Sequence, residues 1–232
     1  MRKANYKETL INLAFLINMM IDALIFCAHP DDEAVAMGGT IAKYSKDGKK
    51  IVVVIFSYGE SSQPLIKKDV IVKYRVTESL NVGKALGSDQ TIFLGVPDGR
   101  ILINMNNGKL LNNIARLIEK YEPDKIFTHS ASEIHLDHRA VYTIVVKALS
   151  SIKHKHNLYT FSIWNPITLF HRNRPRLFVD ITSTFKKKIA AMKSFHSQSH
   201  FIYPLLPIMF IRAKIYGLQN KCRYAEKFYK VT

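Results

Sequence analysis

The residues with the clearest chemical potential lie in a short polar cluster at positions 28–33, Ala-His-Pro-Asp-Asp-Glu. The cluster combines one imidazole with three carboxylates, and carboxylates are rarely buried unless they are paired. Imidazole nitrogen and carboxylate oxygen are suitable ligands for Zn²⁺, and the three-residue offset of His29 and Asp32 lets both reach one ion in a turn. The cluster therefore predicts part of a metal site. Gly38 and Gly39 follow it and permit a close approach of backbone or substrate.

A second cluster, His135-Leu-Asp-His138, lies about a hundred residues further along the chain. Two histidines at positions i and i+3 can share one face where a helix begins. Three protein ligands with one open position are typical of a catalytic zinc site. Either cluster alone could be a capped turn or surface charge, and Asp137 could simply cap a helix N-terminus. Together the two clusters predict a catalytic metal site.

The elements that must position these clusters alternate between strand and helix. Four short apolar segments predict buried strands, at 22–28, 51–56, 91–94 and 125–128. Four longer segments predict helices, at 37–46, 67–86, 106–121 and 137–150. This alternation is typical of a three-layer α/β/α, Rossmann-like sandwich with a mostly parallel sheet. Ligands bind such sheets at the carboxyl ends of the strands, and both clusters follow predicted strands. We therefore expect the metal site at that edge.

Residues 1–232 are predicted to form a single domain, without a linker, repeat or low-complexity tract. Residues 1–21 are expected to be an N-terminal helical extension, with a helix over 6–20, and 199–232 an apolar and basic C-terminal segment. The apolar run at 10–20 is shorter than the roughly 20 residues that span a bilayer. No small-residue cleavage site follows it, so a secretory signal is not expected. The helix could touch a membrane surface, although packing on the domain is the simpler expectation.

Charge is distributed unevenly along the chain. The formal net charge is +16, and residues 139–232 hold 17 basic but only two acidic side chains, Asp180 and Glu226. Such asymmetry indicates an anionic partner for this part, or a solvated basic face without a specific ligand. An apolar stretch at 201–211 precedes Arg212 and Lys214. This composition suits an interfacial membrane contact, but a buried loop around Pro204 and Pro207, lining the pocket or an oligomer contact, is the preferred expectation.

The two clusters resemble the LmbE-like/PIG-L superfamily of zinc-dependent N-deacetylases, in which His-Pro-Asp-Asp-Glu follows an apolar strand and His-x-Asp-His lies downstream. The resemblance covers most of the chain, with further matching segments at 75–78, 94–99, 179–181, 188–191, 196–198 and 224–228. It implies that His29, Asp32 and His138 bind Zn²⁺, although Fe²⁺ or Co²⁺ would also suit such a site. It also implies that Asp31 is the general base that accepts a proton from the metal's water.

The resemblance implies further roles at the same site. His135, as an imidazolium, would stabilise the oxyanion or protonate the leaving amine, with Asp137 orienting it and favouring its charged form. Four residues match substrate-binding positions more loosely: Arg75, Asp98, His196 and Gln198. Arg75 could instead pair with Glu78 on the same helix. His129 is expected to be a hydrogen-bonded pocket histidine and not a fourth ligand.

The implied activity is removal of the N-acetyl group from an N-acetylglucosamine-type sugar or glycoconjugate, anionic or lipid-linked, with release of acetate. An amidase for another small-molecule amide, such as a thiol conjugate or antibiotic precursor, would use the same residues. Cys27 and Cys222 are too few for a disulfide framework, so we expect a cytoplasmic protein, in one version at the inner membrane surface with peripheral membrane contact. A homo-oligomer remains open.

Other classes of function lack their sequence signals. The chain has no phosphate-binding glycine loop, so no nucleotide cofactor is expected. The high isoelectric point of about 9.8 raises nucleic-acid binding, but no such motif accompanies it and no nucleic-acid partner is expected. Cys27 lies inside an apolar strand, and no serine occupies a G-x-S-x-G turn, so a nucleophilic mechanism is disfavoured. Every expected metal and base position is filled, which disfavours an inactive binding module.

Overall fold

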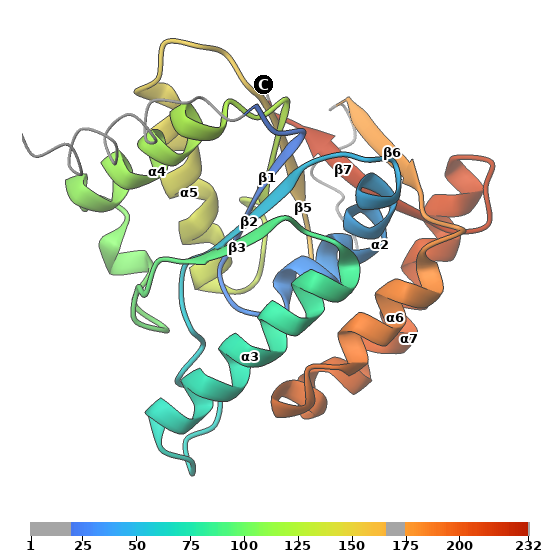
Figure 1. Ribbon diagram of the computed structural model, residues 1–232, viewed down its shortest axis with the longest axis horizontal. Coiled ribbons are helices and arrows are strands. Elements are labelled where there is room, and N and C mark those ends of the chain that lie inside the picture. The colour runs from blue at the N-terminus through green and yellow to red at the C-terminus, as the bar shows by residue number, and fades with distance from the viewer. Residues whose placement is uncertain (1–19, 166–174, 232) are drawn as a thin grey trace, which may run out of the picture.

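Seven strands form one sheet in the computed structural model, which describes residues 20–165 and 175–231 (Figure 1). The helix expected over 6–20 lies outside the described residues, apart from Met20, which is not helical. The strands are β1 (Ala23–Cys27), β2 (Ile51–Ile55), β3 (Gln90–Phe93), β4 (Lys125–His129), β5 (Asn157–Phe161), β6 (Arg176–Asp180) and β7 (Ala225–Lys230). Their order across the sheet is β3-β2-β1-β4-β5-β7-β6.

The five neighbouring strands β3, β2, β1, β4 and β5 run parallel, whereas β7 is antiparallel to both β5 and β6. The sheet is therefore mostly parallel, as predicted. The chain leaves β1 toward β2 and β3 and later returns to β4 on the other side of β1. In open sheets of this kind the ligand crevice forms where the strand order reverses, here between β1 and β4.

Alternate residues of the central strands enter two separate cores. In β1, Ala23, Ile25 and Cys27 face one core, while Leu24 and Phe26 face the other. All five residues are buried, and β2 alternates in the same way. A strand that is apolar throughout must be covered on both faces, and this explains why the central strands show no polar alternation.

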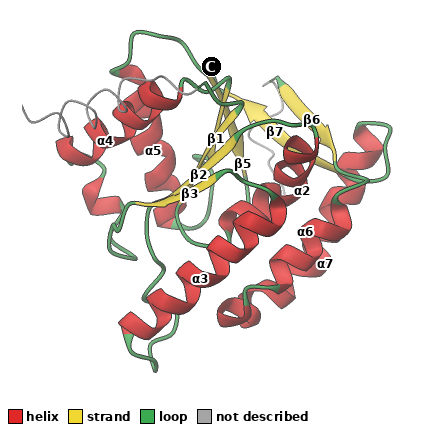
Figure 2. Cartoon of the chain, viewed as in Figure 1, coloured by secondary structure: helices red, strands yellow, loops and turns green. Residues whose placement is uncertain are grey.

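Helices cover both faces, which confirms the three-layer prediction (Figure 2). The helices α4 (Gly108–Tyr121) and α5 (Leu136–Ser150) pack on one face. The helices α2 (Asp32–Lys46), α3 (Lys68–Leu86), α6 (Phe185–Lys193) and α7 (Ser199–Gln219) cover the other. Two short 3₁₀ segments complete the described part, η1 (Leu102–Asn104) and η3 (His196–Gln198).

Two predictions about helices were wrong. The helix predicted to begin at Met37 begins at Asp32, and Met37 marks a kink within it with non-helical dihedral angles. Its first turn carries Asp32, whose negative charge suits the positive end of the helix dipole. The stretch 201–211, expected to be a loop, is helical in α7 despite Pro204 and Pro207. Both prolines are on the exposed side, where an unpaired carbonyl does not have to be buried.

Candidate metal centre and active site

The two polar clusters meet at the carboxyl ends of β1 and β4, as predicted. His29 and Asp31 lie in the turn that joins β1 to α2, and Asp32 opens α2. His138 lies in the first turn of α5, shortly after β4. Ligand atoms of His29, Asp32 and His138 all lie within 4.8 Å of one another, and all three residues are buried. The fold therefore brings the three predicted metal ligands together.

The donor set fits a divalent metal ion. Asp32 Oδ2 accepts hydrogen bonds from the backbone N–H groups of Ala28 (3.0 Å) and His29 (2.8 Å), and Oδ1 faces His138 Nε2 at 3.4 Å. Two ligands that are each about 2.0–2.2 Å from a tetrahedral ion lie roughly 3.3–3.6 Å apart, so this separation suits coordination by both atoms. His29 Nδ1 lies 3.9 Å from Asp32 Oδ2, within ion-pair distance but too far for a hydrogen bond.

Negative charge around His29 favours a cation at this position. Its Nε2 lies 3.1 Å from Asp98 and 3.5 Å from Asp137. Burial alone would lower the pKa of His29, but hydrogen bonds to Asp137 and Asp98 and the charge of Asp32 raise it to about 10. Burial would raise the pKa of Asp98, yet His29 holds it down at about 2. The carboxylates of Asp32, Asp98 and Asp137 therefore create a strongly negative cavity around one imidazole.

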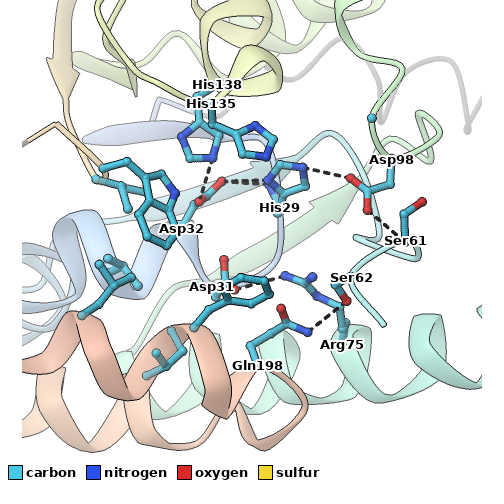
Figure 3. Close-up of a pocket in the computed structure, with 17 residues that line it drawn as sticks. His29, Asp31, Asp32, Ser61, Ser62, Arg75, Asp98, His135, His138 and Gln198 are labelled. Atoms are coloured by element: carbon cyan, nitrogen blue, oxygen red, sulfur yellow. Dashed lines mark hydrogen bonds and ion pairs between the residues drawn. The ribbon is translucent and has the colours of Figure 1, made fainter. Parts of the chain in front are cut away.

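Asp31 enters the same pocket without joining the ligand cluster (Figure 3). Its backbone has φ 120°, a conformation that costs about 1–3 kcal/mol for a residue other than glycine and that concentrates at functional sites. The backbone N–H of Asp31 donates to Glu33 Oε2 (3.1 Å). Burial raises the pKa of the Asp31 carboxyl to about 6, although the charge of Arg75 opposes the rise.

Arg75 is a buried pocket residue that fixes this turn. Its Nη2 donates to the Pro30 carbonyl (2.5 Å) and to Asp31 Oδ2 (3.1 Å), and its Nη1 donates to the Gly59 carbonyl (3.3 Å). The alternative pairing with Glu78 is not found: Glu78 accepts hydrogen bonds from the backbone and side chain of Ser197 instead. Arg75 therefore lines the pocket, as expected for a substrate-binding residue, while it also orients Asp31.

His135 and Asp137 are both at the site, but their relation differs from the one expected. Asp137 Oδ2 accepts from the backbone N–H of Gly99 (2.9 Å) and lies 3.5 Å from His29 Nε2; its charge raises the pKa of His135, as expected, but other groups outweigh this effect. His135, not Asp137, is the N-cap of α5, because its Nδ1 accepts from the Asp137 backbone N–H (3.2 Å). Burial and the charges of His29 and His138 lower the pKa of His135. Because Nδ1 accepts a hydrogen bond, the N–H of the ring is on Nε2.

Glu133 is a buried carboxylate beside the site that the sequence analysis missed. It lies 3.9 Å from His138 Nδ1, on the side of the ring away from Asp32. A carboxylate in this place orients a metal-binding histidine and raises its basicity. His129 is hydrogen-bonded, as expected, because its Nε2 accepts from the Ala28 N–H (3.1 Å), but it is buried behind His138, on which its ring stacks, and does not line the pocket. No spacing rule connects Glu133 with its partners.

The site opens into a pocket of about 340 Å³ that is lined by both polar and apolar residues, and Figure 3 labels ten of the polar ones. The polar side holds His29, Asp31, Asp32, Ser61, Ser62, Arg75, Asp98, Gly99, His135, His138 and Gln198. The apolar side holds Val35, Ile163, Trp164, Phe201, Ile202 and Leu205. No sequence pattern indicates the two serines or the individual apolar residues of the lining. The sequence contains a single tryptophan, Trp164, but no motif around it indicates that it lines the pocket.

Of the two substrate-binding residues expected near the C-terminal helix, only Gln198 lines the pocket. Its Nε2 donates to Ser62 Oγ (3.0 Å) and to the Ser197 carbonyl (2.9 Å). His196, at the start of η3, is exposed and does not line the pocket. The reason is local: η3 turns through His196–Gln198, so residues two apart point in different directions. The expectation for His196 is therefore not met.

Trp164 stands on a short segment that is held from two sides. The N–H groups of Ile163 and Trp164 donate to the Glu133 carboxylate. Arg212 of α7 donates to the carbonyls of Ser162 (2.6 Å), Ile163 (3.0 Å) and Asn165 (3.3 Å). Glu133 thus links a metal-site histidine with the pocket wall, and Arg212 links the same wall with α7.

Known proteins of similar sequence and fold are deacetylases in several cases. The chain is 28% identical over 176 residues to the uncharacterized deacetylase YaiS of Escherichia coli (strain K12). The matched region covers 73% of this chain and 88% of YaiS. It is 25% identical to a 1D-myo-inositol 2-acetamido-2-deoxy-alpha-D-glucopyranoside deacetylase of Rhodococcus jostii (strain RHA1), over 55% of this chain. The chain spans about half, 53%, of that enzyme's length.

Two solved structures share the fold at low sequence identity. The N,N'-diacetylchitobiose deacetylase of Pyrococcus horikoshii has a TM-score of 0.77 and 18% identity, with 99% of this chain and 94% of that chain covered. The 4-carboxy-2-hydroxymuconate hydratase GalB of Pseudomonas putida KT2440 has a TM-score of 0.77 and 22% identity, with 92% and 97% covered. A shared fold by itself therefore does not decide the reaction.

The family match is more specific than these likenesses. Residues 24–149 match the family model described as PIG-L: GlcNAc-PI de-N-acetylase. This span includes both polar clusters and covers more than half of the chain. The protein is therefore a member of the PIG-L family.

Proposed function

We propose that the protein is a zinc-dependent N-deacetylase that hydrolyses the acetamide of an N-acetylglucosamine-type sugar or glycoconjugate, releasing acetate and a free amine. The observation that carries the proposal is the position of Asp31. Its carboxylate lines the same pocket as His29, Asp32 and His138 but stays outside their cluster. A carboxylate that is beside a metal site and free of the metal is available to accept a proton.

His29, Asp32 and His138 would hold the ion. A bound divalent ion supplies Lewis acidity, since it makes water ionise near neutral pH and polarises an amide carbonyl. Asp32 offers one oxygen, because backbone N–H groups bind the other. Glu133 sets the ring orientation of His138 from behind. Zinc suits two imidazoles and one carboxylate, and Fe²⁺ or Co²⁺ would bind the same donors.

Asp31 accepts the proton of the attacking water in this proposal. Arg75 and the backbone of the turn hold its carboxylate toward the pocket, so little reorganisation precedes the transfer. Proton transfer to a positioned side chain typically contributes about 10²–10⁴-fold to a rate. The protonated carboxyl can then return the proton to the leaving amine.

His135 acts as a hydrogen-bond donor to the developing oxyanion. Its Nδ1 is engaged by the backbone of α5, so its Nε2 carries the proton and can donate. A fixed donor of this kind stabilises the oxygen without needing a charged imidazole. The substrate itself lies against Asp98, Arg75 and Gln198 on the polar side of the pocket, and the apolar face of a sugar ring can contact Trp164 on the other side.

Acetate release from a panel of soluble N-acetylglucosaminides, with and without chelator and added Zn²⁺, tests the proposal. We expect activity that chelator removes and Zn²⁺ restores. A panel of N-acetyl amines without a sugar, including a thiol conjugate, distinguishes the alternative amidase. Release of acetate that resists chelation, or sugar substrates that stay intact under every metal, would contradict the proposed reaction.

A further inference from the structure

α7 is apolar on two opposite faces, although only one of them packs on the protein. Its buried face points toward the sheet and consists of Ile202, Leu205, Met209, Ala213 and Gly217. At Gly217 an added Cβ would lie 2.7 Å from the Cys222 carbonyl oxygen, so the helix end is seated closely. Packing through this face explains why the helix is part of the fold. It does not explain why the opposite face is also apolar.

The opposite face carries a continuous apolar row, called here the outer stripe: Phe201, Pro204, Ile208, Ile211, Ile215 and Leu218. These residues follow at alternating steps of three and four, so they align along one side of the helix. All six are exposed, with Ile211 at 58% and Leu218 at 79% of their maximum. A contiguous exposed row of large aliphatic side chains marks an interaction surface in most soluble proteins.

The surroundings of the outer stripe are cationic. Residues 180–232 contain ten lysines and arginines against two acidic residues, Asp180 and Glu226. Glu226 is buried, where it pairs with Lys188 and accepts from the N–H groups of Gly39 and Thr40, so it offsets no surface charge. The neighbouring helix α6, beside α7 in Figure 1, exposes Lys186, Lys187 and Lys193.

This charge pattern disfavours a second copy of the chain as the partner. Helices that pair through an apolar seam use opposite charges beside the seam, but α7 contains no acidic residue. A symmetric contact would also place Lys214 and the lysines of α6 near their own copies. An anionic lipid surface, in contrast, attracts each of these cations.

By length and composition alone, the helical stretch His196–Gln219 could also cross a membrane. Its buried face, however, packs against the domain, and Phe201, Ile202 and Leu205 form part of the pocket wall. Crossing a bilayer would remove that wall. The combination of one packed face, one free apolar face and flanking lysines suits a helix that lies in the plane of a membrane surface.

We propose that the outer stripe of α7 docks the protein onto an anionic lipid bilayer. Phe201 belongs both to the outer stripe and to the pocket, so docking places the apolar side of the pocket next to the lipid headgroups. Hydrogen bonds from Gln63 and Gln198 tie η3, which leads directly into α7, to the loop before α3.

The docking itself does not depend on the reaction in the pocket. Only one consequence rests on the proposed deacetylation: a membrane-anchored N-acetylated sugar would then be the substrate class. Its anchor would remain in the bilayer while the sugar reaches the site beside Phe201. Binding to vesicles can therefore be measured without any substrate, and a failure of either proposal can be recognised separately.

Co-sedimentation of the full chain with vesicles provides the test, using phosphatidylcholine alone and phosphatidylcholine mixed with phosphatidylglycerol. We expect binding to the anionic vesicles that weakens in high salt, because about 1 M salt shortens the screening length to roughly 3 Å. Ile211→Glu should weaken this binding about tenfold or more, since it removes an inserted side chain and adds a repelled charge. Ile103→Glu is the matched control, because Ile103 is exposed on η1, next to α5 on the other face of the sheet.

Two further measurements keep the result interpretable. Circular dichroism and acetate release from a soluble substrate should be the same for both variants, which separates docking from folding and from catalysis. Sedimentation velocity of the unmodified protein should show no self-association through the outer stripe. The proposal is overturned if anionic vesicles do not bind, if Ile211→Glu binds as well as Ile103→Glu, or if Ile211→Glu instead converts a stable dimer to a monomer.

Discussion

Asp31→Asn separates the proposed proton acceptor from the proposed metal site with a minimal change of shape. Asparagine has nearly the same volume and tolerates a positive φ better than most residues, so the backbone at φ 120° can persist. The variant cannot accept a proton at the altered position. Since the ligand cluster consists of His29, Asp32 and His138, its ligand atoms remain in place.

The expected loss of activity is about 10²–10⁴-fold, which is the usual contribution of a positioned general base. Stability should change far less. Removing one partner of a fully buried ion pair costs about 3–5 kcal/mol. Asp31 is 17% exposed at its side chain, and Arg75 keeps the carbonyls of Pro30 and Gly59, so we expect roughly 1–2 kcal/mol here. Asp31→Ala should lose about 1–2 kcal/mol more, because alanine resists a positive φ.

Three measurements on one purified sample test this reasoning. Atomic absorption gives the bound metal per chain, urea unfolding gives the free energy of unfolding, and acetate release gives kcat and KM. We expect full metal content, a modest loss of stability and a fall in kcat. An Asp31→Asn protein that lacks metal would make Asp31 a ligand, and one that retains activity would remove its role as the base. Either result refutes the assignment of roles made from the cluster geometry.

Three further predictions follow from other contacts. Zn²⁺ at a hundredfold excess over its Kd should stabilise the folded protein by about 2.7 kcal/mol and so raise its unfolding temperature. His138→Gln should abolish this rise, and an unchanged rise would place the ion elsewhere. Glu226→Gln leaves Lys188 as an uncompensated buried charge and should cost about 3–5 kcal/mol in urea unfolding, whereas a loss below 1 kcal/mol would show that the pair is solvated. In Arg212→Lys the lysine cannot reach three carbonyls at once, so the segment that carries Trp164 should loosen. Trp164, the only tryptophan, should become more accessible to acrylamide quenching, and KM should rise with kcat nearly constant. Unchanged quenching would contradict the role of Arg212.

Much of the site could be predicted because its signals are local. The offset from His29 to Asp32 and the short spacing from His135 to His138 describe single turns, whose geometry follows from the sequence. Short apolar runs identified the central strands, and the carboxyl ends of parallel strands necessarily meet at one edge of the sheet. The sequence alone therefore predicts where the candidate metal ligands gather.

The partners of several side chains could not be predicted, because they depend on contacts between distant segments. The carboxylate of Asp137 is next to His135 in sequence, yet the close packing of the 98–99 turn against α5 directs it to His29 and the Gly99 N–H. Glu133 contacts residues 30 positions away, in a segment without any motif. No local pattern encodes such pairings.

α7 illustrates the same division most clearly. Its residues are apolar on every side and include two prolines, so their sequence has neither the period of an amphipathic helix nor a reason to be helical. Composition by itself established an apolar segment within a cationic region. Only the tertiary structure decided that the segment is a helix, that one face forms the pocket wall and the other stays free, because packing against the sheet selects which side of an evenly apolar helix is buried.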